Sequence, residues 1–396
     1  MNREEWRPFL RLWSEEWIAG HDPERDGPLG AEVVRDGWLG FAPARAEDLA
    51  AAEARLGRRL PPSLRAFLSV TDGWRNAGVF IYRLAGAGEL EWLADSDDAS
   101  WIEAYSRDDV EEGEIDEGAI LGRSLKLSLD GDAAVMLLDP EDVDEHGEWA
   151  GYWLASWSGE GPERHASFHE LMQAQFSSFH ALRKPPGETR DHWDHQVDEA
   201  RQAALDGAVD GPLSVLTEAG AHGRHRAALL RFQLLVMLGD WRTLPPGHLV
   251  AYIDFEKEPL FAAELLPLLS VEHQYGYWGN FALEILERNA SESVQALIAD
   301  HTERRKEPGF PFPYGNPEFD TAVRRVTARL RDAPEDPEAR RRLMDALWPD
   351  LRGAIRCWRP LNDNHIAPVV LLADPALGEL ITPERGRELL SLRRGA

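Results

Sequence analysis

Residues 56–74 read LGRRLPPSLRAFLSVTDGW, and the fold prediction starts from this stretch. Upstream of it, Leu49, Ala52 and Leu56 recur at spacings of three and four, which is the pattern of one apolar helix face. Gly57 follows at the position where a glycine commonly ends a helix, because it adopts left-handed backbone angles at no steric cost. The spacing therefore predicts a short helix that ends at the beginning of the stretch.

A second short helix is expected immediately afterwards. The pair Pro61-Pro62 stops the first helix and presets the first turn of the next one. Asp72-Gly73 is a turn signal that closes this second helix, and strand-like sequence follows it. The residues that would share its apolar face are Leu60, Leu64, Phe67 and Leu68.

The same stretch resembles the signature of the SUKH superfamily. The residues that carry the resemblance are Glu53, Leu56, Gly57, Leu60, Pro61, Phe67, Leu68, Asp72, Gly73 and Trp74. The superfamily is known mainly for immunity proteins that bind and neutralise bacterial toxins, and it has a fungal branch that regulates cell-wall synthesis. The resemblance implies helices packed on a small mixed or antiparallel sheet. The motif itself consists of core and hinge positions and contains no catalytic group.

The length of 396 residues predicts two domains. We expect an α+β domain of SUKH type, with an N-terminal helical extension, over residues 1–185. An all-α helical domain is expected over residues 186–396, where the apolar periodicity is helical throughout. The boundary is placed at Lys184-Pro185-Pro186-Gly187, because proline and glycine interrupt the preceding helix.

Within the first domain, several segments alternate or are bounded by turn residues as strands are. Ser167 with Glu170 three residues later predicts the start of the helix that closes this domain. The turn Asp130-Gly131-Asp132 predicts a hairpin. The expected strands are 78–84, 120–129, 133–138 and 150–157.

The first twenty residues predict an amphipathic helix with an unusually aromatic stripe. That stripe consists of Trp6, Phe9, Leu10, Trp13 and Trp17. Such a surface suits a partner, but packing of the stripe against the domain is the favoured interpretation.

Composition excludes several classes of protein. The net charge of −27 argues against direct binding of nucleic acid, which depends on Lys and Arg. No apolar run approaches the roughly 20 residues that cross a bilayer, and the N-terminus lacks the order of a secretory signal. Cys357 is the only cysteine, so intrachain disulfides and multi-cysteine zinc sites are excluded. We expect a cytoplasmic protein without a membrane partner.

Negative charge is concentrated in residues 91–150, which hold 20 Asp/Glu and 3 Lys/Arg. One interpretation is a solvated segment; another is a docking surface for a basic protein, and metal binding is the least favoured. No calcium-binding loop pattern is present. The predicted partner contacts are Asp95, Asp97, Asp98, Trp101, Tyr105, Asp108, Asp109, Glu111, Glu112, Glu114, Asp116, Glu117, Asp142, Asp144 and Glu145.

No catalytic, cofactor-binding or metal-binding residues are predicted. His192 and His195 lie one helical turn apart but lack the third ligand that a metal site needs. No nucleophile motif, phosphate-binding loop or dinucleotide fingerprint occurs. The sequence therefore predicts a non-catalytic immunity protein that neutralises a basic toxin, such as a nuclease, through its acidic surface. The alternative is a regulatory scaffold that binds through the helical domain. The sequence assigns no oligomeric state.

Overall fold

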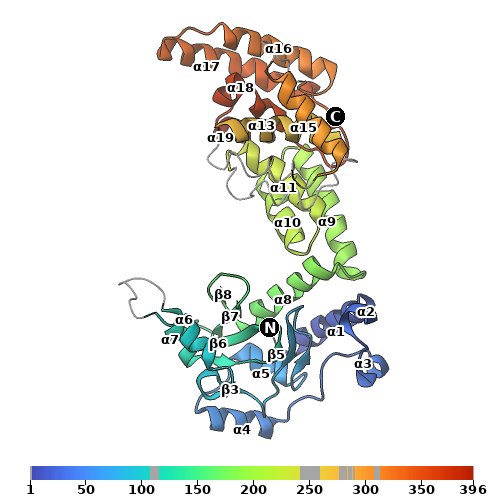
Figure 1. Cartoon of the computed structure of the whole chain (residues 1–396), viewed down its shortest axis with the longest axis vertical. Helices are drawn as coiled ribbons and strands as arrows, with labels where there is room; N and C mark the ends of the chain where they lie inside the picture. Colours follow the sequence, from blue (N-terminus) through green and yellow to red (C-terminus); the bar gives the residue numbers. More distant parts are fainter. Residues whose placement is uncertain are drawn as a thin grey trace. The chain divides into compact units, whose positions relative to one another are not determined.

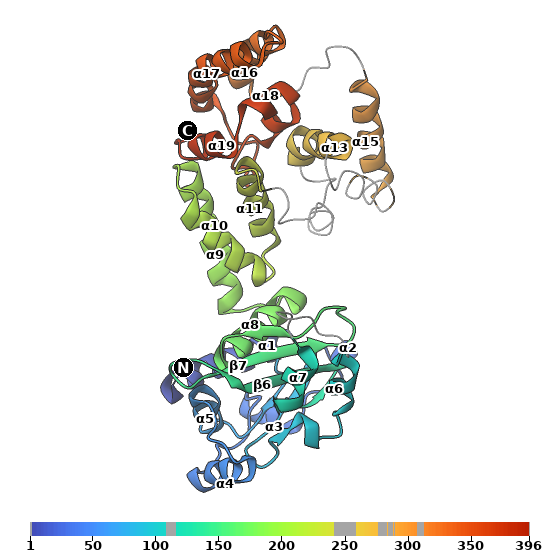
Figure 2. The same ribbon diagram turned by 90° about the vertical axis from the view of Figure 1, so that its left-hand side faces the viewer.

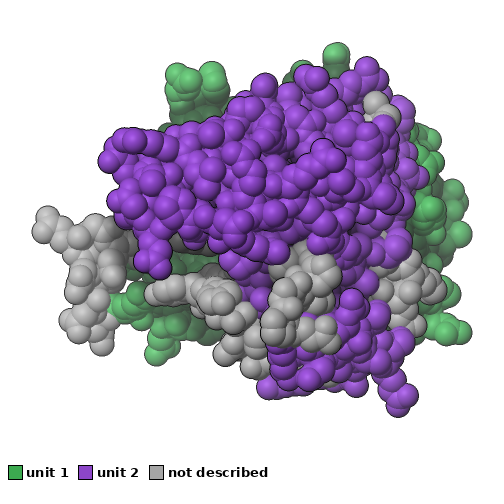
Figure 3. All heavy atoms as spheres, turned by 90° about the horizontal axis from the view of Figure 1, so that it is seen from above, with its two compact units in different colours: residues 1–191 green, residues 192–396 purple. Residues whose placement is uncertain are grey.

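The computed structural model describes residues 2–107, 116–240, 259–275, 283, 288, 290–306 and 313–395. The chain forms two compact units, residues 1–191 and 192–396, which are coloured separately in Figure 3. The division falls within the helix α9 (Glu188–Leu205), whereas the predicted boundary at residue 185 lies in the link before it. None of the described helices combines the length and the apolar character of a bilayer-spanning segment.

Unit 1 contains two antiparallel sheets. The three-stranded sheet has the order β1 (Trp74–Arg75), β2 (Ile81–Leu84), β5 (Ser128–Gly131). The five-stranded sheet has the order β3 (Glu91–Trp92), β4 (Leu125–Lys126), β6 (Ala134–Val143), β7 (Trp149–Ala155), β8 (Glu163–His165). Leu127 alone separates β4 from β5. Its N–H donates to Met136 and its carbonyl accepts from Ala85, so this residue joins the two sheets.

The central strands β6 and β7 bury side chains on both faces. Successive strand residues point to opposite sides, so Met136 enters the main core while Val135 and Leu137 enter a second, smaller cluster. The helices around the main core are α1 (Arg3–Ala19), α4 (Ala46–Leu56), α5 (Pro62–Leu68) and α8 (Phe168–Arg183). The second cluster is covered by α6 (Ser100–Tyr105) and α7 (Glu117–Arg123). Figure 1 shows α6 and α7 on one side of β6 and α1 on the other.

The predicted starts and ends of helices agree with the capping geometry. Gly57 ends α4 with a φ of 70°, and Pro62 occupies the first turn of α5. Ser167 begins α8, where its hydroxyl accepts the Glu170 N–H at 3.2 Å. The tryptophan stripe of α1 packs on the domain as favoured: Trp6, Leu10, Trp13 and Trp17 are all buried.

One strand prediction was wrong in part. Residues 120–123 belong to α7, and the strand begins only at Leu125. The helix forms because the Asp116 carboxylate accepts the Ala119 N–H at 2.9 Å and so caps its first turn. The pair Ile120 and Leu121, which suggested a strand, then packs against the second cluster from a helix.

The described part of unit 2 is helical, and its buried side chains form one core. Figure 2 shows α16 and α17 side by side. α11 is buried on nearly all sides, as its apolar sequence predicts. Besides α9, the described helical elements of unit 2 are α10 (Asp210–Ala221), α11 (His225–Met237), η2 (Phe261–Leu265), α13 (Leu266–Tyr275), α15 (Glu292–Arg304), α16 (Pro317–Arg331), α17 (Pro337–Ala354), η3 (Ile355–Cys357), η4 (Val369–Ala373), α18 (Pro375–Leu380) and α19 (Pro383–Leu390).

Buried polar side chains hold the irregular segment 358–368 in this core. The side-chain amide oxygen of Gln233 accepts hydrogen bonds from the N–H groups of Ile366 and Ala367 at 2.8 and 3.3 Å. Glu264 accepts the Val370 N–H at 2.7 Å and lies 3.3 Å from the ring of His365. Buried backbone donors outside helices need such partners, so these polar residues have structural roles.

Candidate functional site

The acidic segment was the predicted partner surface, and the structure describes part of it. Asp95 and Asp97 are exposed at and just after the end of η1 (Leu93–Asp95). Asp98 is partly buried, and its carboxylate lies 2.5 Å from Nζ of the buried Lys126. The first two carboxylates are therefore open to solvent, whereas Asp98 compensates a buried charge. The other predicted contacts of this segment lie outside the described residues: Asp108, Asp109, Glu111, Glu112 and Glu114.

The two aromatic residues of the segment anchor it to the body of unit 1. Trp101 and Tyr105 stack, with ring centroids 6.1 Å apart and planes 17° apart. Both are half-buried on α6 and pack against the second cluster, next to Leu121 and Val135. Both rings pack within unit 1, and their contact with a partner stays a prediction.

Several predicted carboxylates already have intramolecular roles. Asp116 caps α7, and Glu117 is half-buried in its first turn. Asp144 accepts the N–H groups of His146 and Glu148, both at 2.8 Å, and so forms the turn between β6 and β7. These backbone hydrogen bonds, from Glu148 first, lower the pKa of Asp144. Glu145, in contrast, is exposed at the tip of that turn.

Asp142 is the most constrained of the predicted contacts. Its two oxygens accept from Nε and Nη2 of Arg164 at 2.6 and 2.8 Å, and the Tyr152 hydroxyl donates to it at 3.2 Å. The hydrogen bonds from Arg164 are the main reason that the pKa of Asp142 is lowered. This ion pair joins the end of β6 to β8 within the same sheet, so Asp142 stabilises the sheet edge.

The motif residues lie in the core and at the joint between α4 and α5. Glu53 accepts from the Leu60 N–H at 3.2 Å and from Arg65 at 2.5 Å, which fixes the loop between the two helices. Asp72 accepts the Ala87 N–H at 2.6 Å, and Gly73 has a φ of 102°. Pro61 is the N-cap of α5 and Gly57 the C-cap of α4. The buried apolar members are Leu56, Leu60, Phe67, Leu68 and Trp74.

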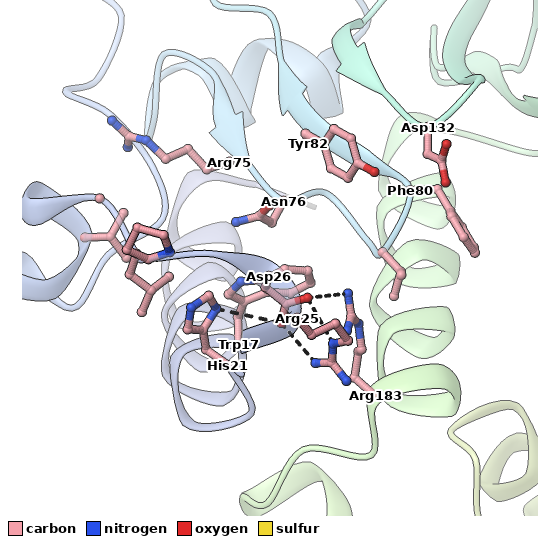
Figure 4. Close-up of a pocket in the computed structure, with 15 residues that line it drawn as sticks. Trp17, His21, Arg25, Asp26, Arg75, Asn76, Phe80, Tyr82, Asp132 and Arg183 are labelled. Carbon is pink, nitrogen blue, oxygen red and sulfur yellow. Dashed lines mark hydrogen bonds and ion pairs between the residues drawn. The ribbon is translucent and has the colours of Figure 1, made fainter. Parts of the chain in front are cut away.

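A cavity of about 480 Å³ opens on unit 1, and Arg75, which directly follows the motif residue Trp74, lies in its wall (Figure 4). Its wall comes from the end of α1, from α2 (Pro23–Asp26), from β1 and β2, and from the last turn of α8. The lining combines charged side chains with aromatic ones. This cavity could not be predicted from the sequence, because its wall comes from segments more than 150 residues apart.

The α-helical side of the cavity is occupied by a compact ion-pair cluster. Asp26 accepts two hydrogen bonds from Arg25, at 3.0 and 2.9 Å, and lies 2.9 Å from Arg183. The Arg25 hydrogen bonds, with the charge of Arg183, lower the pKa of Asp26 to about 2. Arg75 is also engaged: it donates to the Leu39 and Gly40 carbonyls and to Glu32. The cations on this side are thus already satisfied within the chain.

The strand side of the cavity carries aromatic rings with exposed faces. Tyr82 on β2 is 44% exposed, and Phe80 precedes it. Trp157, just after β7, is 50% exposed and its ring centroid lies 4.6 Å from that of Phe80. The alternation of buried Ile81 with Phe80 and Tyr82 was visible in the sequence and signals outward-facing aromatics; Trp157 was not predictable as their neighbour.

No group of three or more His, Cys, Asp or Glu side chains suited to a metal ion occurs among the residues that the structure describes. The predicted surface histidines His192 and His195 are exposed on α9, where His195 lies 3.5 Å from Glu199. We therefore assign no ligand set to this pair.

A comparison with known protein families identifies the family of a segment of unit 1. Residues 43–174 match the SMI1 / KNR4 family (SUKH-1). This segment belongs to the SUKH superfamily. The match begins shortly before α4 and ends within α8, so it includes the α4–α5 motif and both sheets. The match confirms the predicted relationship to the SUKH superfamily and agrees with the predicted α+β fold class with a helical part. No curated protein and no solved structure matches the chain.

Proposed function

We propose that this chain is a non-catalytic immunity protein that binds a basic toxin through unit 1 and blocks its activity. The observation that carries the proposal is the SUKH domain over residues 43–174, since the superfamily is consistent with an immunity or regulatory role. The polar motif residues support a non-catalytic reading, because Glu53 and Asp72 are engaged in holding backbone N–H groups.

Electrostatics supports a basic partner. Most of the net charge of −27 comes from residues 91–150. Among the described carboxylates of this region, Asp95, Asp97, Asp132 and Glu145 are exposed. Exposed charge of one sign attracts a partner of the opposite sign and raises its association rate. A nuclease toxin needs a cationic surface to hold phosphate, so it would be drawn to this surface.

The test is to capture the partner and measure its activity. The tagged full-length chain is incubated with lysate at low salt, and bound proteins are identified by mass spectrometry. We expect a basic toxin whose activity falls in proportion to the amount of added chain, at one chain per toxin. A captured protein that stays fully active when bound would contradict the immunity role.

The second candidate function is a regulatory scaffold. It is favoured by the presence of a separate helical core in unit 2, outside the family match. Residues 1–191 alone discriminate the two functions, provided that circular dichroism shows the fragment to be folded. An immunity module keeps toxin binding in this fragment, whereas a scaffold that binds through its helical unit loses the partner.

A further inference from the structure

Three aromatic side chains on this side of unit 1 are called the aromatic ledge: Phe80 and Tyr82, which line the cavity, and Trp157, which packs against Phe80. The Trp157 indole N–H donates to the Asp132 carbonyl at 3.0 Å, and the Asp132 N–H donates to the Phe80 carbonyl at 2.8 Å. These bonds hold the turn after β5 against the segment before β2. The Trp157 ring is therefore held in place against Phe80, although it is about half exposed.

Exposed aromatic rings that are held in place are unusual on a surface whose only contact is with solvent. Tyr and Trp offer large contact areas at low entropic cost and are enriched at the centres of protein interfaces. Behind the ledge, Trp153 lies with its ring centroid 5.8 Å from that of Trp157. The ledge thus continues into the packed interior and does not need to rearrange to bind.

Two carboxylates flank the ledge. Asp132 lines the cavity and is exposed, and Asp130 lies two residues before it at the end of β5. In the described part of the chain neither forms an ion pair. Arg83, which faces Asp130 across the strands, is instead paired with Glu89 at 2.6 Å. Burial raises the pKa of Tyr82, and the negative charges of Asp132 and Asp130 raise it further.

The opposite side of the cavity does not compete for the same ligand. Arg25 and Arg183 there are paired with Asp26, and the charge of Asp22 also acts on Arg25, so the positive charges of this cluster are balanced within the chain. Figure 4 shows this cluster apart from Tyr82 and Asp132. An incoming cation is attracted by Asp130 and Asp132, whose charges have no ion-pair partner in the described part of the chain, so the position that it prefers is the ledge.

We propose that the aromatic ledge, with Asp130 and Asp132, receives an arginine side chain of the partner protein. A guanidinium stacks on aromatic faces and bonds a carboxylate through two parallel N–H groups, which a lysine ammonium cannot do. The inference rests on the proposed function, because it names the chemistry by which a basic toxin is recognised. Phosphate groups of nucleic acid are repelled at the same place.

The test uses the full-length chain and a capped Gly-Arg-Gly peptide as the probe. Binding is followed by the NMR resonance of the Trp157 indole N–H, assigned with Trp157→Phe. A matched peptide with citrulline in place of arginine keeps the size and planarity and lacks the charge. We expect the arginine peptide to shift this resonance and the citrulline peptide to bind about tenfold more weakly, since hydrogen bonds to charged groups are the stronger ones.

Variants locate the site. Asp132→Asn should weaken arginine-peptide binding about tenfold, while its backbone bonds to Trp157 and Phe80 are retained. Glu4→Gln, at an exposed carboxylate of α1 outside the acidic region, should leave binding unchanged. Tyr82→Leu removes a stacking face without changing charge and should also weaken binding, which keeps the test decisive if the Asp132 variant does not fold.

Two results would overturn the inference: a Trp157 resonance that the arginine peptide leaves unmoved, or equal binding of both peptides. Either result is distinguishable from failure of the proposed function. If the chain inhibits its toxin but does not bind the arginine peptide, only the proposal on the aromatic ledge is rejected. If the chain binds the peptide but inhibits no toxin, only the proposed immunity role is rejected.

Discussion

The ring of His180 on α8 lies 2.9 Å from the carboxylate of Glu16 on α1, and both side chains are buried. The other oxygen of Glu16 accepts the Thr189 N–H at 2.8 Å. One carboxylate therefore joins α1, α8 and the first turn of α9. Burial alone would raise the pKa of Glu16, but the hydrogen bonds from His180 and Thr189 lower it overall.

This relationship predicts a pH-dependent stability. A carboxylate whose pKa is lower in the folded state stabilises the fold above its unfolded value of 4.5, and this contribution is lost as the pH falls through the folded pKa. Glu16→Gln should lower the free energy of unfolding of unit 1 by about 1–3 kcal/mol at neutral pH. The difference between variant and parent should shrink below about pH 4. Urea unfolding at several pH values measures it. Glu15→Gln, an exposed neighbour, is the control, and a constant difference at all pH values would contradict the assignment.

The motif helix α5 predicts a large effect of truncating its apolar face. Leu64 and Phe67 are 2% and 1% exposed. Leu64→Ala or Phe67→Ala should therefore cost about 2–5 kcal/mol of unfolding free energy, because each leaves a cavity in the main core. Tryptophan fluorescence during urea unfolding is the readout. Arg59→Ala, at an exposed position next to the helix, should be nearly neutral; a similarly mild effect of the two core changes would show that this face is not packed.

Two glycines of the motif, one after α4 and one after α5, distinguish backbone strain from steric conflict. Gly57 and Gly73 both have positive φ, at 70° and 102°. A Cβ at position 57 meets no atom within 4 Å, whereas one at position 73 lies 2.9 Å from the Leu84 carbonyl oxygen. We expect Gly57→Ala to cost about 1–2 kcal/mol, the price of the left-handed conformation alone. Gly73→Ala should cost clearly more, because β1 must also move away from β2. Thermal unfolding compares the two variants, and equal costs would refute the proposed conflict.

Local signals in the sequence predicted much of this fold. The cap at Ser167 and the tryptophan stripe of α1 act over a few residues, so their outcome was visible in the sequence. The hairpin predicted at Asp130-Gly131-Asp132 formed only in part, because β4 pairs with β6 whereas β5 pairs with β2 in the other sheet. Residues 120–123 were misassigned because Ile120 and Leu121 suit a strand or a buried helix equally well, and the cap at Asp116 decided between them.

The candidate site was much less predictable, since its chemistry depends on pairs distant in the chain. Asp142 was expected to be open, but β8 brings Arg164 to it. Phe80 and Trp157 become neighbours only through the two sheets. Charge density along the sequence identified an acidic region and could not show which carboxylates are neutralised within the fold.

The most direct test of the account is the association rate of the captured toxin with the full-length chain. Stopped-flow measurements at about 50 mM and about 500 mM salt should show at least a tenfold fall in the rate, because screening removes the attraction between the charged surfaces. Asp95→Lys combined with Asp97→Lys should slow association at low salt, whereas Asp332→Lys combined with Glu335→Lys in unit 2 should not. Association that is independent of salt and of both pairs of changes would contradict recognition of a basic toxin by the acidic surface of unit 1.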